Sequence, residues 1–323
     1  MKFYKKYLFV FSIALLVGLS IHLLLFCLSL GHNPAEHNGN DWFNVKDSYA
    51  KSITQPKLVF ISGSNTLFGV DTAKIEKVLN IPTVNYGVVA NYNFYTLHRA
   101  KPHLKSGDIV ILPLEYTCFY DYKPTRVDTG FAQYITGYDA DFFKNLPISE
   151  QLSIICQLTP RELMKSTWQQ IKPPTIDEND GYSSKHLNTN GDMTNNPTDK
   201  RTSSKILLSK LKDSPFKSQP PTEEAKTELA KFINFCHENN IKVYAAWPNF
   251  LWKAKEFTGK DLDGIHAIED FYHAHNVEIL GEYTDCLYDA NLFYDTEYHL
   301  NEEGKRIHTD YLINLLKDKL PQR

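Results

Sequence analysis

The sequence lacks the signatures of several classes of protein. Its 35 lysines and arginines nearly balance its 38 aspartates and glutamates, so the formal charge of -3 gives no overall attraction for nucleic acid. Its five cysteines form no Cys-x-x-Cys pair and no metal-ligand spacing, and we predict neither a metal site nor a bound cofactor. The mean hydropathy of -0.38 argues against a polytopic membrane protein.

One long apolar run is present near the N-terminus. Leu8 to Leu30 is interrupted only by Gly18, small hydroxyl side chains and His22, and three lysines precede it. At about 1.5 Å per residue, a helix over this run would cross a hydrocarbon core of about 30 Å. The run is also longer than the apolar core of a signal peptide, which is about 7 to 15 residues. We therefore predict an uncleaved anchor over residues 1–31, rather than a cleaved signal.

The lysines before this run predict its orientation. Positively charged flanks remain on the cytoplasmic side, so we expect the rest of the chain to face outward. The protein would then be a single-pass protein of the bacterial cytoplasmic membrane, with a periplasmic or extracellular domain. Residues 32–56 are polar and are expected to form a tether.

From residue 57 onward, short β-rich runs alternate with helical patterns. This alternation is typical of an α/β fold in which helices flank a mainly parallel sheet. The predicted strands are Leu58–Ile61, Thr83–Tyr86, Asp108–Leu114, Lys242–Trp247 and Val277–Leu280. The predicted helices are Thr72–Leu79, Asn93–Leu104, Thr222–Asn239, Leu262–His275 and Glu302–Lys319.

Residues 119–221 interrupt this alternation and are predicted to be an insertion. Their first part is aromatic, and we expect helices that pack over the sheet. Residues 172–204 have too little apolar surface to offset the entropy of ordering, which predicts a mobile polar loop. The stretches Asp177–Gly181 and Asn188–Asp192 hint at calcium, but they lack the terminal glutamate of the calcium-binding loop, so a solvated loop is preferred.

Two short segments carry the residue types of a serine hydrolase. Ser64 follows a predicted strand, and the carboxyl end of a strand is where an α/β sheet presents a nucleophile. His299 is close in sequence to Asp295 and Glu297. A serine hydroxyl needs a base to take its proton, and that base is usually oriented by a carboxylate. We therefore predict a site formed by Ser64 and His299, with Asp295 or Glu297 as the acid.

The order of these residues resembles the SGNH/GDSL hydrolase superfamily. In that family, the serine lies in a Gly-Asp-Ser block after the first strand, and a late Asp-x-x-His block supplies acid and base. Ser62-Gly63-Ser64 takes the place of the first block. Gly69-Val70-Asp71 and the run from His299 to Gly304 look more like the membrane-anchored branch, which includes accessory proteins of teichoic-acid D-alanylation and of polysaccharide export.

The resemblance implies a flavodoxin-like three-layer sandwich and a set of catalytic roles. Ser64 would be the nucleophile, His299 the base and Asp295 the favoured acid. The backbone N–H groups of Asn65 and Gly87 would bind the oxyanion, because Asn85-Tyr86-Gly87 matches the second family block.

The third family block, Gly-x-Asn-Asp, has no counterpart in this chain. Residues 112–116 stand in its place and contain Glu115. Glu115, Glu297 and Asn249 are predicted as substrate contacts or alternative acids.

These inferences predict a membrane-tethered serine esterase or acyltransferase of the SGNH type. Its substrate would be an acyl group on a cell-envelope glycan or lipid, with a membrane-bound O-acyltransferase as a candidate partner. The alternative is a non-catalytic accessory or binding module that keeps the fold. The missing third block and the four-residue spacing from Asp295 to His299 favour that alternative.

Overall fold

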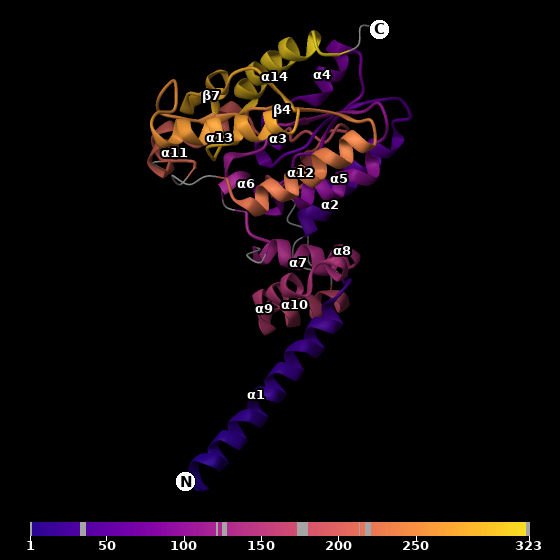
Figure 1. Ribbon diagram of the computed structural model, residues 1–323, viewed down its shortest axis with the longest axis vertical. Helices are drawn as coiled ribbons and strands as arrows, with labels where there is room; N and C mark the ends of the chain where they lie inside the picture. Colours follow the sequence, from indigo (N-terminus) through magenta and orange to yellow (C-terminus); the bar gives the residue numbers. More distant parts are fainter. Residues whose placement is uncertain are drawn as a thin grey trace. The chain divides into compact units, whose positions relative to one another are not determined.

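The computed structural model describes residues 2–32, 37–120, 122–124, 128–172, 180–212, 214–216 and 221–320. The chain divides into two compact units, and many of their helices and strands are labelled in Figure 1. The helical unit comprises Met1–Asn40 and Pro124–Glu178, and the sheet unit comprises Asp41–Lys123 and Asn179–Arg323.

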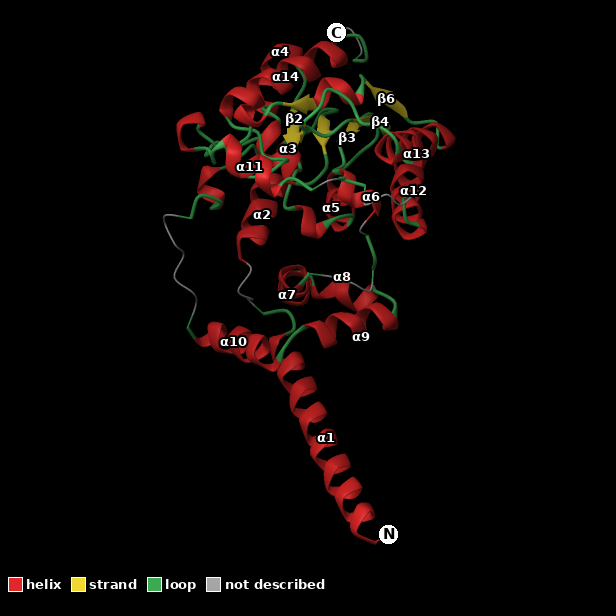
Figure 2. Ribbon diagram, turned by 90° about the vertical axis from the view of Figure 1, so that its left-hand side faces the viewer, coloured by secondary structure: helices red, strands yellow, loops and turns green. Residues whose placement is uncertain are grey.

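A five-stranded parallel sheet forms the centre of the sheet unit (Figure 2). Its strands, in spatial order, are β2 (Thr83–Asn85), β1 (Leu58–Phe60), β3 (Ile109–Leu112), β4 (Lys242–Ala246) and β6 (Glu278–Leu280). All five predicted strands are confirmed. From β1 the chain adds β2 on one side of the sheet and then β3 on the other, so the strand order reverses between β1 and β3. In doubly wound sheets, ligands bind at the carboxyl ends of the strands at such a point.

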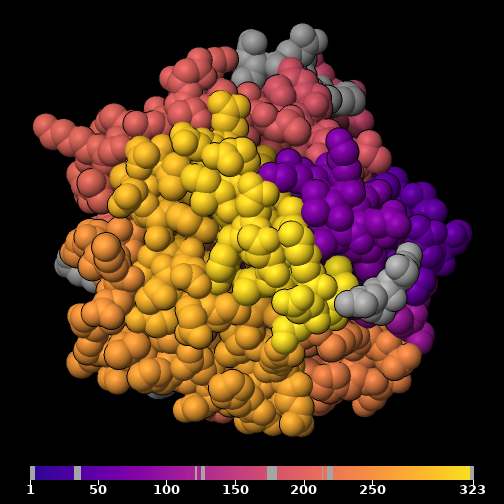
Figure 3. Space-filling view, turned by 90° about the horizontal axis from the view of Figure 1, so that it is seen from above, coloured from indigo at the N-terminus to yellow at the C-terminus, as the bar shows by residue number. Residues whose placement is uncertain are grey.

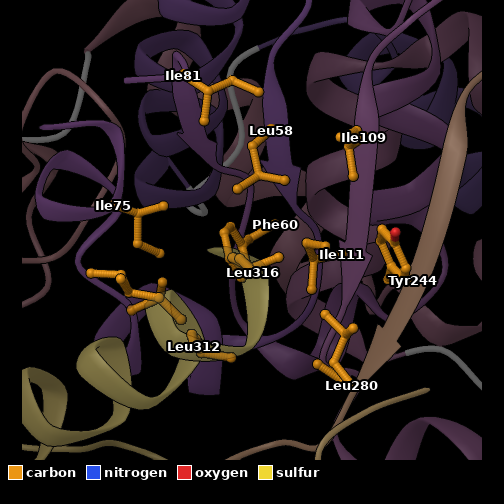
Figure 4. Packing of buried hydrophobic residues seen from close by; sticks show 13 residues of the cluster. Leu58, Phe60, Ile75, Ile81, Ile109, Ile111, Tyr244, Leu280, Leu312 and Leu316 are labelled. Atoms are coloured by element: carbon orange, nitrogen blue, oxygen red, sulfur yellow. The ribbon is translucent and has the colours of Figure 1, made fainter. Parts of the chain in front are cut away.

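Helices cover both faces of the sheet. On one face, α4 (Thr72–Leu79) and α14 (Glu302–Lys317) pack over apolar side chains of the strands (Figure 4). That core contains Leu58, Phe60, Ile75, Ile109, Ile111, Tyr244, Leu280, Leu312 and Leu316. Figure 3 shows α14 in yellow beside the purple residues of α4. On the other face, Ala245 and Ile279 meet Ile268 and Tyr272 of α13 (Lys260–Ala274), and α12 (Glu223–Glu238) packs on β4.

The sheet unit also contains shorter elements. Besides α2, which is described below, these include α3 (Ser64–Gly69), α5 (Tyr95–Ala100), α6 (Tyr116–Tyr120), α11 (Ser204–Lys210), β5 (Phe250–Leu251) and β7 (Leu287–Tyr288). Its 3-10 helices are η1 (Ala90–Tyr92), η2 (Lys101–His103), η3 (Ser184–His186), η4 (Thr198–Lys200), η5 (Tyr283–Cys286) and η6 (Ala290–Leu292). The five predicted helices are confirmed, although the one expected over residues 93–104 is divided into α5 and η2.

The segment predicted as a tether contains a helix, α2 (His37–Ser52). Trp42, Phe43, Lys46 and Ala50 of this helix are buried in the sheet unit. Their spacing of about one helical turn places them on one face, and burial of that face stabilises the helix. The prediction of a polar tether over residues 32–56 is therefore wrong for this part of the chain.

The polar segment after residue 179 packs into the sheet unit and differs from the expected mobile loop. Asn190, Asp192 and Asn196 are buried, and their side chains are satisfied by hydrogen bonds. Asp192 accepts hydrogen bonds from Thr72 Oγ1 at 2.7 Å and from Asn85 Nδ2 at 2.8 Å. This carboxylate is thus used inside the fold, whereas residues 173–179, including Asp177, lie outside the described residues.

The helical unit contains α1 (Lys2–Ser29), α7 (Thr129–Tyr138), α8 (Ala140–Asn145), α9 (Ile148–Gln157) and α10 (Pro160–Ile171). The aromatic part of the insertion forms helices, as predicted, but they cluster with α1 rather than with the sheet. Residues Tyr4–Ser29 of α1 are long and apolar enough to span a membrane, with a mean hydropathy of 2.6.

Candidate active site

Ser64 is the first residue of α3, which begins after a three-residue turn from β1 at the carboxyl edge of the sheet. The Nδ2 atom of Asn65 donates to the carbonyl oxygen of Pro113 at 2.7 Å. This bond ties the start of α3 to the loop after β3, which is the neighbour of β1 in the sheet. Ser64 therefore lies where the strand order reverses, the usual position of a site in a doubly wound sheet.

Glu115 contributes a buried carboxyl group to the same place. It is 2% exposed, and its Oε1 accepts hydrogen bonds from Ser64 Oγ at 3.2 Å and from the backbone N–H of Asn65 at 3.0 Å. A Cβ atom on Gly63 would collide with Oε1, so only glycine permits this approach. Burial raises the pKa of Glu115, and the Asn65 N–H, the charge of His299 and the Ser64 hydroxyl reduce that rise without cancelling it.

His299 is held by a carboxylate on one side. Its Nδ1 donates to Asp295 Oδ1 at 2.7 Å, and the hydroxyl of Tyr182 donates to Oδ2 of the same carboxylate. Burial alone would raise the pKa of Asp295, but the hydrogen bond and charge of His299, together with the Tyr182 hydroxyl, hold it below its usual value. The backbone N–H of His299 donates to Thr296 Oγ1 at 3.2 Å, which helps to shape the turn between Asp295 and His299.

The imidazole is also stacked on α3. The rings of His299 and Phe68 are nearly parallel, with 4.2 Å between their centroids and an interplanar angle of 11°. Phe68 follows Ser64 by four residues, so both side chains lie on one face of the helix. The stacking therefore places His299 on the face of α3 that carries Ser64.

Ser64 and His299 are not joined by a hydrogen bond. In the described part of the chain, Ser64 Oγ donates to Glu115, and the ring of His299 is bonded through Nδ1 to Asp295. Each of the two residues is 7% exposed, so the site opens only narrowly to solvent. The other ring nitrogen of His299, Nε2, is not part of this bond.

Both predicted oxyanion donors are already used. The backbone N–H of Asn65 donates to Glu115, and the backbone N–H of Gly87 donates to Asn85 Oδ1 at 2.9 Å. A Cβ atom on Gly87 would lie 2.5 Å from the backbone nitrogen of Leu67, so glycine is required for the loop after β2 to approach α3. An oxyanion at Asn65 would have to displace the Glu115 carboxyl group.

Asn249 is fully buried and supports the His299 loop instead of lining a cleft. Its Nδ2 donates to the carbonyl oxygen of Tyr298 at 2.6 Å, next to His299 in the chain. Its Oδ1 atom lies against Gly69 and has no hydrogen-bond partner among the described residues.

Glu297 is not the carboxylate on His299. Its carbonyl oxygen accepts from the backbone N–H of Leu251 at 2.8 Å, and its side chain lines a surface cavity together with Thr117 and Phe250. Its negative charge contributes to the raised pKa of Glu115. Glu297 therefore acts on the site through charge, while Asp295 makes the contact with the imidazole.

Sequence reasoning missed Phe68 and Tyr182, which hold the imidazole and its acid. The four-residue spacing of Phe68 from Ser64 was a usable signal, whereas Tyr182 lies in a polar segment with no recognisable pattern.

Sequence reasoning also missed a buried polar network beneath the site. Asn85 Nδ2 donates to the carbonyl oxygen of Thr66 at 2.9 Å and to Asp192, which links β2, α3 and the polar segment. Lys46 Nζ donates to the carbonyl oxygens of Asn85 at 2.9 Å and Gly191 at 2.6 Å, and burial lowers the pKa of Lys46 to about 7.

Comparison with known proteins adds no family assignment. No protein-family model matches the sequence, and no match was found among curated proteins. Within the described ranges, no cluster of three or more His, Cys, Asp or Glu side chains is placed to hold a metal ion.

Proposed function

We propose that this protein is a membrane-tethered serine esterase or acyltransferase of the SGNH type. The observation that carries the proposal is the placement of His299, which is bonded to Asp295 and stacked on the face of α3 that begins with Ser64. A base oriented by a carboxylate and placed beside a serine is the arrangement that serine acyl transfer requires.

Each residue has a role in this proposal. The Ser64 Oγ attacks the acyl carbon of an ester or thioester, and its proton passes to Nε2 of His299. Asp295 stabilises the imidazolium that forms and, through Nδ1, fixes which nitrogen faces the serine. Tyr182 holds the Asp295 carboxylate in position. His299 then returns the proton to the leaving group.

Glu115 takes the place of the side-chain donor that the absent third block would provide. Its Oε1 lies at the Asn65 N–H, where the acyl oxygen of a substrate would bind. Burial raises the pKa of Glu115, so it keeps its proton to a higher pH than an exposed carboxyl group does, and in the protonated form it can donate a hydrogen bond to a developing oxyanion. Substrate binding would therefore move Glu115 from Ser64 and Asn65 toward the acyl oxygen.

The apolar α1 helix supports a site at a membrane surface. A tether is most useful when the acyl donor or acceptor is itself at the membrane, so we propose a cell-envelope glycan or lipid as substrate. Lys2, Lys5 and Lys6 at the start of α1 support an orientation with the N-terminus in the cytoplasm and the sheet unit outside it. A membrane-bound O-acyltransferase is the proposed partner. The strand order β2-β1-β3-β4-β6 supports a flavodoxin-like, SGNH-like fold.

A fluorophosphonate probe tests the chemistry directly. The full-length protein in detergent should be labelled covalently, and Ser64→Ala should abolish the labelling. Ser62→Ala is the matched control, because Ser62 is two residues away and donates to the carbonyl oxygen of Pro113 instead of facing Glu115. Labelling that survives Ser64→Ala would refute the assignment of the nucleophile.

The orientation has its own test. A reporter enzyme fused after Asn40 should be active only outside the cytoplasm, and activity inside the cell would reverse the proposed topology.

A non-catalytic accessory or binding module is the second candidate. The contacts of Glu115 favour it, because this carboxyl group engages both the serine hydroxyl and the Asn65 N–H. Under this alternative the wild-type protein would not react with the probe at any pH between 6 and 9, although it would bind an acylated envelope glycan.

A further inference from the structure

The helical unit presents a second apolar surface in addition to α1. In the described part of the chain, eight exposed large apolar side chains lie outside α1, and five of these belong to α9 and α10. The five are Ile148, Leu152, Met164, Trp168 and Ile171, with exposed fractions of 53 to 75%. Such a concentration on a small unit marks an interaction surface.

These side chains form a stripe on each helix. Ile148 and Leu152 are one turn apart on α9, and Met164, Trp168 and Ile171 follow the same face of α10. Other apolar side chains of the two helices, Ile154 and Leu163, are buried. Each helix therefore has one apolar face in the core of the unit and a second one exposed.

The basic side chains of α10 indicate the chemistry of the partner. Arg161 and Lys165 are exposed on α10, and Lys172 is exposed at its end. The one acidic residue of α10, Glu162, is used in a capping box with Thr159 at the start of the helix. The exposed apolar stripe of α10, which these cations flank, suits a surface with anionic headgroups.

The position of the stripe relative to α1 identifies the partner. α9 and α10 meet α1 near its C-terminal end, where His22 Nε2 donates to the carbonyl oxygen of Ile155 at 3.1 Å and Gln170 Nε2 donates to that of Leu28 at 3.0 Å. From Tyr4 to His22 the helix rises about 27 Å, close to the hydrocarbon thickness of about 30 Å. A bilayer around this part of α1 would therefore end where α9 and α10 cross it.

The other helices of the unit, α7 and α8, do not cover the side of α9 and α10 that lies toward the N-terminal part of α1. Figures 1 and 2 show α7 and α8 on the side of α9 and α10 that is away from the N-terminal part of α1. The side of α9 and α10 that α7 and α8 leave uncovered is the side of the N-terminal part of α1, which is the part that a bilayer would surround. Trp168 suits this position, because indole rings concentrate at the interface between lipid and water.

We propose that α9 and α10 lie in the membrane interface, with the five apolar side chains inserted among the lipids at the headgroup level. The partner is the surface of an anionic bilayer. The apolar face of the two helices would be buried about 5 to 10 Å into the boundary between headgroups and acyl chains. This inference rests on the proposed membrane anchor. It adds that the unit is held at the bilayer by a surface as well as by a spanning helix.

Spin labels on the full-length protein test the proposal. The exposed Cys27 and Cys156 are first replaced by serine, and a nitroxide is then attached to Leu152→Cys or Met164→Cys. The protein is reconstituted into vesicles of phosphatidylethanolamine and phosphatidylglycerol. Power saturation compares the accessibility of each label to oxygen, which enters lipid, with its accessibility to a water-soluble nickel chelate.

Two further labels serve as controls. Lys144→Cys on α8 is exposed on another helix of the same unit and should report water. Leu16→Cys lies in the middle of α1 and should report the hydrocarbon core. We expect labels at 152 and 164 to favour oxygen, at a depth between those of the two controls.

Each other outcome refutes the proposal in a distinguishable way. Nickel accessibility at 152 and 164 equal to that at 144 would show that the stripe faces water. Shielding from both reagents would show that a protein, such as a second copy of this chain, covers the stripe. A label at Leu16 that reports water would show instead that the anchor itself is wrong.

Discussion

Replacement of Glu115 by glutamine should stabilise the protein above weakly acidic pH. The carboxyl group is 2% exposed, and its Oε1 accepts two hydrogen bonds that a glutamine Oε1 can also accept. The substitution therefore keeps the shape and both acceptor contacts, and it removes only the ability to ionise.

The sign of the effect follows from the raised pKa of Glu115. Between its ordinary value of 4.5 and the higher folded-state pKa, the folded protein binds a proton that the unfolded chain has lost. The free energy of unfolding of the wild type should therefore fall by about 1.4 kcal/mol per pH unit across this interval and stay constant above it. Glu115→Gln should not show this loss. The difference between the two proteins should be absent below pH 4.5, grow through the interval and then remain constant.

Urea unfolding of the sheet unit, followed by circular dichroism at a series of pH values, measures this difference. Glu297→Gln is the matched control, because its side chain is half-exposed and it should change the unfolding free energy by less than about 0.5 kcal/mol. An equal pH dependence in Glu115→Gln and the wild type would refute the argument that ionising this carboxyl group is costly.

The same residue makes a prediction about reactivity. Glu115→Ala removes the proposed donor to the oxyanion, so the rate of fluorophosphonate labelling should fall by a factor of about 100 to 1000. Glu115→Gln should retain most of the rate, because its amide N–H can donate to the same oxygen. Faster labelling of Glu115→Ala than of the wild type would show that Glu115 only blocks the serine.

Three further predictions concern contacts around the site and in the core. Asp295→Asn should slow the labelling of Ser64 by about 10,000-fold, whereas Glu297→Gln should slow it less than about tenfold, and the reverse ranking would move the acid to Glu297. Asp108→Asn should lower the free energy of unfolding, measured in urea, by about 3 to 5 kcal/mol, because it breaks a buried ion pair with Lys57 at 2.6 Å. A decrease of less than about 1 kcal/mol, which is typical of an exposed ion pair, would contradict this prediction. Gly87→Ala should destabilise the fold by about 1 to 3 kcal/mol, since its methyl group would collide with the backbone of Leu67. Wild-type stability of this variant would show that the loop after β2 can move.

The sheet could be predicted from sequence because its signals are local. Each strand is a short run of β-branched and apolar residues, and α12 has a regular apolar face from Ala225 to Cys236. The hydrogen bond between Asp295 and His299 could also be predicted, because the same short segment offered only Asp295 and Glu297 as the carboxylate. α2 was mistaken for a tether, because Lys46 and Asp47 look solvated in sequence although both are buried.

The contacts that define the site could not be predicted, because they join residues far apart in the chain. Glu115 is 51 residues from Ser64, and Tyr182 is 113 residues from Asp295. The polar segment around Asp192 gave a misleading signal. Its composition is that of a disordered loop, yet buried hydrogen bonds to Asn85 and Thr72 hold it in the fold, and composition alone does not reveal such partners.

The division of the chain into two units limits how a water-soluble form can be made. The helical unit is built from two stretches that are separated in sequence, Met1–Asn40 and Pro124–Glu178. Removal of the first stretch alone would leave α7 to α10 without α1, and Phe143 would lose its contact with Phe26. The apolar surface so exposed would favour aggregation. A soluble sheet unit therefore requires the removal of both stretches, with a linker that joins Lys123 to the residues after Glu178.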